Sequence, residues 1–278
     1  MNKVIEIEQL TKNYGKHRGV QDVSFTVEQG DIFGFLGPNG AGKSTTIRSM
    51  LGLIQYESGT VRILGKDLKQ EKEVILKEIG YMPSEAMFYP NMRVKDVIKM
   101  AADIRKKNCS AEAEKLCTRL QVDTEKRINE LSLGNRKKVS IVCAMQHKPK
   151  IFVFDEPTSG LDPLMQAEFF KLIGEYVAEG ATCMLSTHVL SEVKNYCKHV
   201  AIMKEGHLQC VDTVDKLTKT NAKRIRMVRD GKKEDYIYKG DLNKLADELV
   251  GHNITDILIE EPSLDEIFMH FYESESIQ

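Results

Sequence analysis

The sequence lacks long hydrophobic runs and has no excess of charge of either sign. No stretch approaches the roughly 18 consecutive apolar residues that mark a membrane-spanning helix. The N-terminal segment, MNKVIEIEQL, contains acidic side chains and no continuous apolar core, which is unlike a secretory signal peptide. Lys and Arg number 40 against 41 Asp and Glu, and this balance disfavours a generally basic nucleic-acid binder. We therefore expect a protein that is not secreted, has no transmembrane helix of its own and has no nucleic acid as a partner.

The six cysteines lack the spacing of metal or redox motifs. None forms a C-x-x-C pair, and no group of Cys and His has zinc-finger spacing. Scattered thiols in a chain of 278 residues are typical of the reducing cytosol, so we interpret them as packed or idle side chains. The sequence shows no internal repeat, and a size of about 150 residues per domain allows two domains.

The hydrophobic pattern predicts short strands before residue 83. These strands are expected at residues 4–7, 23–27, 31–36, 60–64 and 79–82. The first two alternate apolar and polar residues, as half-buried antiparallel strands do. The third, DIFGFL, runs into a glycine-rich loop, after which we expect a helix over residues 44–53.

The middle of the chain changes from a helical to an alternating pattern. From residue 83 to 133 the sequence is polar, and Val94, Val97 and Ile98 recur at helical spacing. Residues 151–154 and 182–185 then form near-continuous apolar strands with a helix expected between them, over residues 164–179. This βαβ order predicts an α/β fold with a parallel sheet that is buried on both faces.

The C-terminal part reads as a small α+β domain over residues 216–278, after a first domain over 1–215. We expect strands at about 224–229, 235–239 and 254–260, and helices at about 241–250 and 264–273. Six basic residues lie between 223 and 233. We interpret this stretch as a solvated strand edge, with contact to a partner or to anionic lipid as the alternative.

A phosphate-binding loop lies between the third strand and the following helix. The sequence GPNGAGKS matches G-x-x-x-x-G-K-[S/T], in which glycines let backbone N–H groups face phosphate oxygens at a helix N-terminus. The Lys43 ammonium can reach the β- and γ-phosphates, and the Ser44 hydroxyl can bind Mg²⁺. The predicted phosphate-binding residues are Gly37, Pro38, Asn39, Gly40, Ala41, Gly42, Lys43, Ser44 and Thr45.

Two acidic residues end the apolar strand that begins at residue 151. Asp155 can hold Mg²⁺ through water, and Glu156 can polarise an attacking water as a general base. The alternative is a surface acidic pair that caps the next helix. Together with the loop, these residues predict a nucleoside triphosphatase that uses Mg²⁺.

Further motifs indicate which kind of triphosphatase this is. LSLGN stands at residues 131–135, PTSGLD at 157–162 and STH at 186–188. The whole set resembles the ATP-binding subunits of ABC transporters, over about residues 3–215. The resemblance implies a P-loop ATPase domain with a parallel sheet core, an antiparallel β subdomain and a helical subdomain at about residues 84–140.

The resemblance also assigns roles to individual residues. Lys43, Glu156 and His188 would be catalytic, with His188 contacting the γ-phosphate and the attacking water. Tyr14 matches the aromatic residue on which adenine stacks, with a turn tyrosine packed on the sheet as the alternative. Ser132 and Gly134 would close over ATP bound to the other protomer, and Asp162 would couple the two sites across the dimer.

The sequence departs from the family pattern at two places. Ser84 stands where a glutamine is usual, and it could bind Mg²⁺ only through water because its side chain is short; Glu85 is the alternative. Leu133 replaces a glycine, although Gly134 is retained. LSLGN, the PSE loop at 83–85 and the segment PSLDEIF at 262–268 resemble a bacterial branch linked to drug, lantibiotic or peptide export.

This branch pairs its ATPases with separate permease chains. The candidate contact residues are Met87, Phe88, Tyr89 and Met92, in the region where the family receives the permease's coupling helix. The alternative is that they cover the helical subdomain's own core.

We therefore expect a cytosolic ATPase subunit, peripheral on the inner face of the membrane, that binds ATP between two copies or two similar subunits. One alternative is a soluble ABC ATPase acting on nucleic acid or the ribosome, but the chain has neither a long coiled coil nor a second cassette. Another is a regulatory ATP-binding subunit, against which the intact Glu156 and His188 argue. The transported substrate and its direction stay open.

Overall fold

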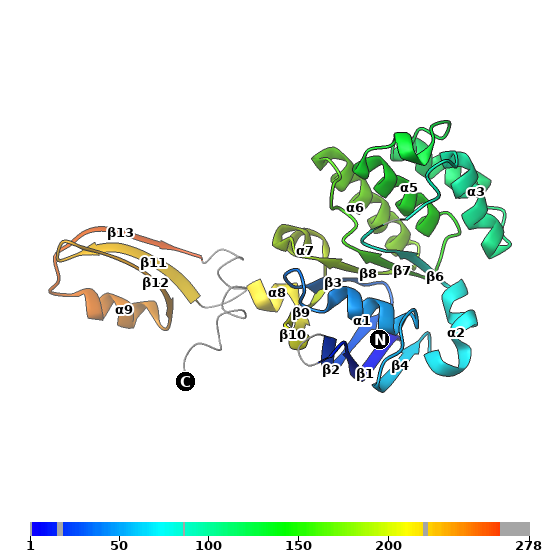
Figure 1. The fold of residues 1–278 in the computed structure, drawn as a ribbon. Helices are drawn as coiled ribbons and strands as arrows, with labels where there is room; N and C mark the ends of the chain where they lie inside the picture. Colours follow the sequence, from blue (N-terminus) through cyan, green and yellow to red (C-terminus); the bar gives the residue numbers. More distant parts are fainter. Residues whose placement is uncertain (1, 16–18, 86, 219–221, 262–278) are drawn as a thin grey trace. The chain divides into compact units, whose positions relative to one another are not determined.

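The computed structural model describes residues 2–15, 19–85, 87–218 and 222–261, and it divides into two compact units, Met1–Asp212 and Thr213–Gln278 (Figure 1). Each unit has its own sheet or sheets and its own buried side chains.

An antiparallel sheet of four strands opens the first unit. Its order is β2-β1-β4-β5, with bounds β1 Lys3–Asn13, β2 Gly19–Glu28, β4 Ser58–Ile63 and β5 Lys66–Asp67. Alternate residues such as Ile5, Ile7 and Phe25 are buried while their neighbours face solvent. The predicted antiparallel strands at 4–7 and 23–27 are confirmed, and both are longer than the alternation indicated.

A second, six-stranded sheet carries the predicted site. Its order is β10-β9-β3-β8-β7-β6. The bounds are β3 Ile32–Leu36, β6 Ile79–Met82, β7 Ile151–Asp155, β8 Thr182–Thr187, β9 His199–Lys204 and β10 His207–Thr213. β3 runs parallel to β8 and β9, and β7 runs parallel to β6 and β8. β7 and β8 are buried at every residue, as their continuous apolar runs predict.

Helices cover both faces of this sheet. In Figure 1, α1 (Lys43–Met50) and α2 (Leu68–Lys77) lie on the side of the antiparallel sheet, and α6 (Pro163–Ala178) lies on the other side. On the α6 side, Phe154 makes an edge contact with Phe169, with 5.3 Å between the ring centroids. A short helix, α7 (Leu190–Tyr196), follows β8.

The residues between β6 and β7 form a helical subdomain. It contains α3 (Val94–Arg105), α4 (Ser110–Arg119), the short 3₁₀ helix η1 (Ile128–Glu130) and α5 (Leu133–Met145). The Arg119 guanidinium at the end of α4 pairs with Glu168 at 2.6 Å and with Glu175, both on α6. The helical subdomain is thus tied to the helix that follows the Asp155–Glu156 strand.

The second unit begins with α8 (Val214–Thr218) and folds around a three-stranded antiparallel sheet. Its order is β12-β11-β13, with bounds β11 Ala222–Arg229, β12 Lys232–Lys239 and β13 Ile254–Glu260, and α9 spans Leu242–Leu249. β11 is the central strand, so the interpretation of residues 223–233 as a strand edge is wrong for the part that β11 contains. Cross-strand pairs explain its basic side chains, since Arg224 binds both oxygens of Asp235 at 2.9 and 2.8 Å. The helix predicted at 264–273 lies outside the described residues.

Candidate active site

The glycine-rich loop is shaped by positions where only glycine fits. Gly40 and Gly42 have φ angles of 83° and 104°, in the left-handed region that other residues rarely adopt. A Cβ on Gly42 would lie 2.6 Å from the Val20 side chain, and one on Gly37 would lie 2.6 Å from the Met203 carbonyl oxygen. The loop can therefore wind closely around the N-terminus of α1.

The loop borders a cleft of about 810 Å³. The cleft is lined by Asn13, Tyr14, Gly15, Gly19, Gln21, Asn39, Gly40, Ala41, Gly42, Lys43, Ser44, Thr45, Glu156, Glu205, Gly206 and His207. The half-exposed Tyr14 lies at this cleft, as its predicted role in stacking adenine requires. The turn at Gly206 is an addition that the sequence analysis missed: its N–H donates to the Ala41 carbonyl at 3.0 Å.

Lys43 lies inside the curve of the loop and is only 4% exposed. Its ammonium donates to the Gly37 carbonyl at 2.6 Å and to the Pro38 carbonyl at 3.1 Å, and it lies 3.7 Å from Glu156 Oε1. Burial lowers the pKa of Lys43, and the neighbouring carboxylates of Glu156 and Asp155 oppose that shift. A phosphate held by the loop would meet this cation directly.

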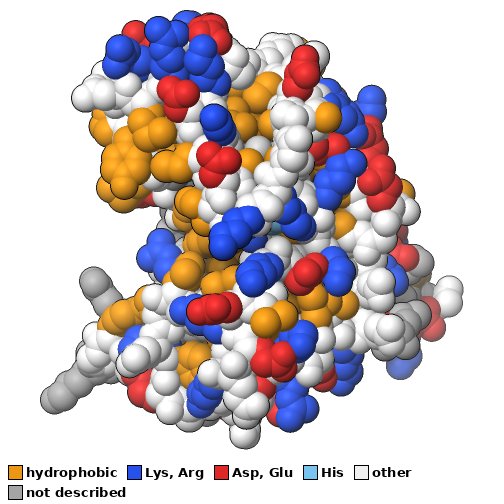
Figure 2. All heavy atoms as spheres, turned by 90° about the vertical axis from the view of Figure 1, so that its right-hand side faces the viewer, with side chains coloured by type: hydrophobic (Ala, Val, Ile, Leu, Met, Phe, Trp, Pro, Cys, Tyr) orange, Lys and Arg blue, Asp and Glu red, His pale blue; other side chains and the backbone are white. Residues whose placement is uncertain are grey.

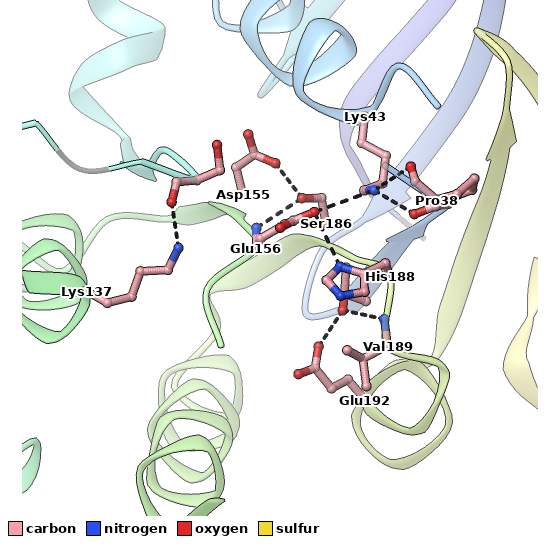
Figure 3. Close-up of polar contacts among 12 residues, drawn as sticks. Pro38, Lys43, Lys137, Asp155, Glu156, Ser186, His188, Val189 and Glu192 are labelled. Atoms are coloured by element: carbon pink, nitrogen blue, oxygen red, sulfur yellow. Dashed lines mark hydrogen bonds and ion pairs between the residues drawn. The ribbon is translucent and has the colours of Figure 1, made fainter. Parts of the chain in front are cut away.

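Asp155 and Glu156 leave the end of β7 in different environments (Figure 3). Asp155 is fully buried; its Oδ1 accepts a 2.6 Å hydrogen bond from the Ser186 hydroxyl, whereas its buried Oδ2 has no hydrogen-bond partner among the described residues. Glu156 adopts a φ of 51°, and its carboxylate lies 3.5 Å from His188 Nδ1. Left-handed backbone at a residue other than glycine is uncommon and costs about 1–3 kcal/mol.

The donor set fits a magnesium ion that also binds nucleotide oxygens. The described residues contain no group of three or more His, Cys, Asp or Glu side chains that could hold a metal. Mg²⁺ commonly binds one or two carboxylates plus substrate phosphates and water. The unpartnered Oδ2 of Asp155 and the Ser44 hydroxyl at the cleft are suited to that kind of site.

His188 directly follows β8, at a turn fixed by hydrogen bonds of the residues on either side of it. The Thr187 hydroxyl donates to Glu192 at 2.6 Å and accepts from the Val189 N–H at 3.0 Å. The imidazole itself is 48% exposed beside Glu156. The structure thus brings together the predicted catalytic residues Lys43, Glu156 and His188.

The LSLGN and PTSGLD residues do not lie in this cleft. Ser132 caps α5 by accepting from the Asn135 N–H at 3.3 Å, and Asp162 caps α6 by accepting from the Met165 N–H at 3.0 Å. Gly134 packs against the Gly160 carbonyl oxygen, which a Cβ would approach to 2.4 Å. The neighbouring Leu133 is 63% exposed.

A second, smaller cleft of about 530 Å³ adjoins the first. Its lining residues are Asn39, Ser44, Ser84, Glu85, Met87, Leu133, Arg136, Lys137, Glu156 and Ser159. Ser84 and Glu85, the alternative Mg²⁺ residues, both line it together with Ser44. Lys137 was missed by the sequence analysis: its ammonium donates to the Ser84 carbonyl at 2.7 Å.

Comparison with known proteins places the chain in a family. The family model described as "ABC transporter" matches residues 20–159. The bacitracin transport ATP-binding protein BcrA of Bacillus licheniformis is 39% identical over 227 residues, which is 80% of this chain and 74% of that protein. The chain belongs to the ABC transporter family. It is therefore an ATP-binding ABC protein with ATP hydrolase activity, as the motifs predict.

Other ABC proteins share the sequence and the fold. The probable multidrug ABC transporter ATP-binding protein YbhF of Escherichia coli is 36% identical over 79% of this chain, which spans only 39% of that protein. A solved ATP-binding subunit of an ABC transporter, 26% identical, superposes with a TM-score of 0.75 over 97% of this chain and all of that one. In the described part of this ABC protein, no helix has both the length and the apolar character needed to cross a membrane.

Proposed function

We propose that this chain is the subunit that binds and hydrolyses MgATP to drive a separate membrane permease, which exports a drug, peptide or lantibiotic-like substrate. The placement of Glu156 between Lys43 and His188 carries the hydrolytic half of this proposal. The names of the two relatives, a bacitracin transporter and a probable multidrug transporter, support the export half.

The side chains divide the work of hydrolysis. Backbone N–H groups of the loop and the Lys43 ammonium bind the β- and γ-phosphates, and Tyr14 stacks on adenine. Ser44 and Asp155 would hold Mg²⁺, which would neutralise charge on the transferred phosphoryl group. Glu156 accepts a proton from the attacking water, while His188 orients that water beside the γ-phosphate.

The lid over the γ-phosphate comes from a second chain in this proposal. Ser132 caps α5 and Gly134 lies in its first turn, a helix N-terminus that suits phosphate binding, but neither residue lines this chain's own 810 Å³ cleft. A second copy, or a similar ATPase subunit, would supply those residues, and Asp162 would link the two sites.

The permease contact is proposed for the segment that follows β6. Met87 and Tyr89 are 92% and 67% exposed, as predicted, whereas Phe88 and Met92 are half-buried, in line with the alternative of core packing. Figure 2 shows hydrophobic side chains gathered on the upper lobe of one face, above a hollow. Met and aromatic residues are enriched in protein interfaces, so this segment suits a permease docked at the inner face of the membrane.

Co-purification from membranes tests this proposal. The tagged chain is expected to bring down a hydrophobic permease. A Met87→Ala, Tyr89→Ala variant is expected to lose it while keeping its MgATP affinity, since neither change puts a charge into the cleft that Met87 lines. The matched control is Ile104→Ala, at an exposed apolar residue at the end of α3. Recovery of nucleic acid or ribosomes in place of a permease would contradict the proposal.

A further inference from the structure

Lys137 is a buried cation beside the ATP site. It lies on α5 in the turn after the Ser132 cap and is only 4% exposed. Burial lowers the pKa of Lys137, while the carboxylates of Glu156, Asp155 and Glu85 oppose the shift. Burying an ammonium is costly, and groups whose charge state is perturbed by burial and by specific charges are concentrated at functional sites.

The Lys137 ammonium connects two segments that are far apart in the sequence. It donates at 2.7 Å to the Ser84 carbonyl, the backbone group that leads out of β6 toward Met87 and Tyr89. Figure 3 draws this contact next to Asp155 and Glu156, at the end of β7. Lys137 also lines the 530 Å³ cleft together with Ser44.

The hydrogen bond from Lys137 acts on Ser84, the position at which the family usually has a glutamine. The Ser84 side chain is short, so the side chain alone cannot fix the loop against the carboxylates. A bond to the Ser84 carbonyl fixes the peptide itself, whatever side chain the residue carries. α5 packs along β6, so the lysine approaches the loop from a rigid helix.

We propose that Lys137 is a positioning residue for ATP hydrolysis, whose ammonium holds the Ser84 peptide against the carboxylates that end β7. The loop after Ser84 is thereby kept in register with Glu156 during turnover. The inference concerns the hydrolytic step and does not depend on which substrate the permease carries.

Lys137→Met tests the inference, because methionine keeps the unbranched aliphatic stem and removes the ammonium. Turnover should fall about 10- to 100-fold, the scale of a small misplacement of reacting groups. KM for MgATP should change by less than about threefold, since no contact to nucleotide is lost. Lys137→Arg, which retains N–H donors and charge, should stay within about threefold of wild-type turnover.

Two controls separate positioning from a general effect on the helix. Lys138→Met makes the same change at the next residue of α5, which is also buried but does not line the cleft. Ser84→Ala leaves the carbonyl in place and removes only the hydroxyl, so it measures separately any part that the hydroxyl plays in binding Mg²⁺. Lys138→Met is expected to keep near wild-type turnover, and thermal unfolding should show all the variants folded.

Each result either supports the positioning role of Lys137 or overturns it. A fall in kcat confined to Lys137→Met supports the inference. Equal losses in Lys137→Met and Lys138→Met, no recovery in Lys137→Arg, or a rise in KM at constant kcat would each overturn it. If Lys137→Met does not fold, Lys137→Gln, which also removes the ammonium, takes its place under the same criteria.

Discussion

Glu156→Gln is expected to stop hydrolysis while ATP binding persists. The amide is nearly isosteric with the carboxylate, so the bond from the Glu156 backbone N–H to the Ser186 hydroxyl can stay. It cannot accept the proton of the attacking water, and general-base catalysis is typically worth about 10²–10⁴-fold in rate. We therefore expect turnover to fall by at least about 10²-fold.

Removing the negative charge of Glu156 should also favour the binding of MgATP. Glu156 Oε1 lies 3.7 Å from the Lys43 ammonium, a distance at which two charges interact by up to about 4 kcal/mol at an effective dielectric constant near 20. Without that carboxylate, Lys43 is freer to bind phosphate, and the anionic nucleotide no longer faces a negative side chain. The affinity for MgATP should therefore be equal to or tighter than that of the wild type.

Two assays read the result. Phosphate release measures turnover, and size-exclusion chromatography with MgATP is expected to show a trapped dimer for the variant and mostly monomer for the wild type. Glu205→Gln makes the same charge change in the same cleft and should leave turnover near wild type. Normal hydrolysis by Glu156→Gln would mean that Glu156 is not the base. An inactive variant that stays monomeric in saturating ATP would mean that a different subunit supplies the lid.

Three further changes test other parts of the structure. Lys43→Ala should abolish useful MgATP binding, because the ammonium that meets the β- and γ-phosphates is lost; unchanged affinity by titration would refute the loop assignment. Gly134→Ala would place a methyl group 2.4 Å from the Gly160 carbonyl oxygen, so we expect a loss of about 1–3 kcal/mol in unfolding free energy and slower turnover, and a wild-type denaturation curve would contradict this. Burial lowers the pKa of His147 from 6.5 to about 4. Between these two pH values the unfolded chain is protonated at His147 and the folded chain is not, so the free energy of unfolding should fall as the pH drops from about 6.5 toward 4. His147→Leu should flatten this dependence by about 3 kcal/mol in pH-dependent denaturation, and an unchanged slope would show that His147 is not its source.

The sequence predicted the parts whose local pattern and final environment agree. The apolar runs at residues 151–154 and 182–185 become fully buried parallel strands, because helices and the four-stranded antiparallel sheet cover the two faces. The glycines of the phosphate loop adopt the φ angles that the motif requires. These features depend mainly on residues that are adjacent in the sequence, so the sequence alone predicts them.

Features that depend on distant contacts were not predictable in the same way. The sequence analysis did not predict the helix α2, because its apolar pattern is weak. This helix buries only Leu68 and Ile75 and contains a non-helical residue, Glu71. The hairpin turn at Gly206 reaches the cleft only because β9 pairs beside β3. The central position of β11 likewise follows from pairing with β13, which is 25 or more residues later in the chain.

Lys137 illustrates why such residues escape a reading of the sequence. Arg136, Lys137 and Lys138 follow the LSLGN motif as a basic run on a helix, which by itself indicates a solvated face. Packing of α5 along β6 buries Lys137 and Lys138 instead, and it aims the Lys137 ammonium at the Ser84 carbonyl. At the start of the same helix, Ser132 and Gly134 do not line the 810 Å³ cleft, whereas Leu133 between them lines the 530 Å³ cleft together with Lys137. In the dimer that we propose, α5 would present its first residues to a second chain and its next turn to the loop of its own site, and it would thereby connect the two sites directly.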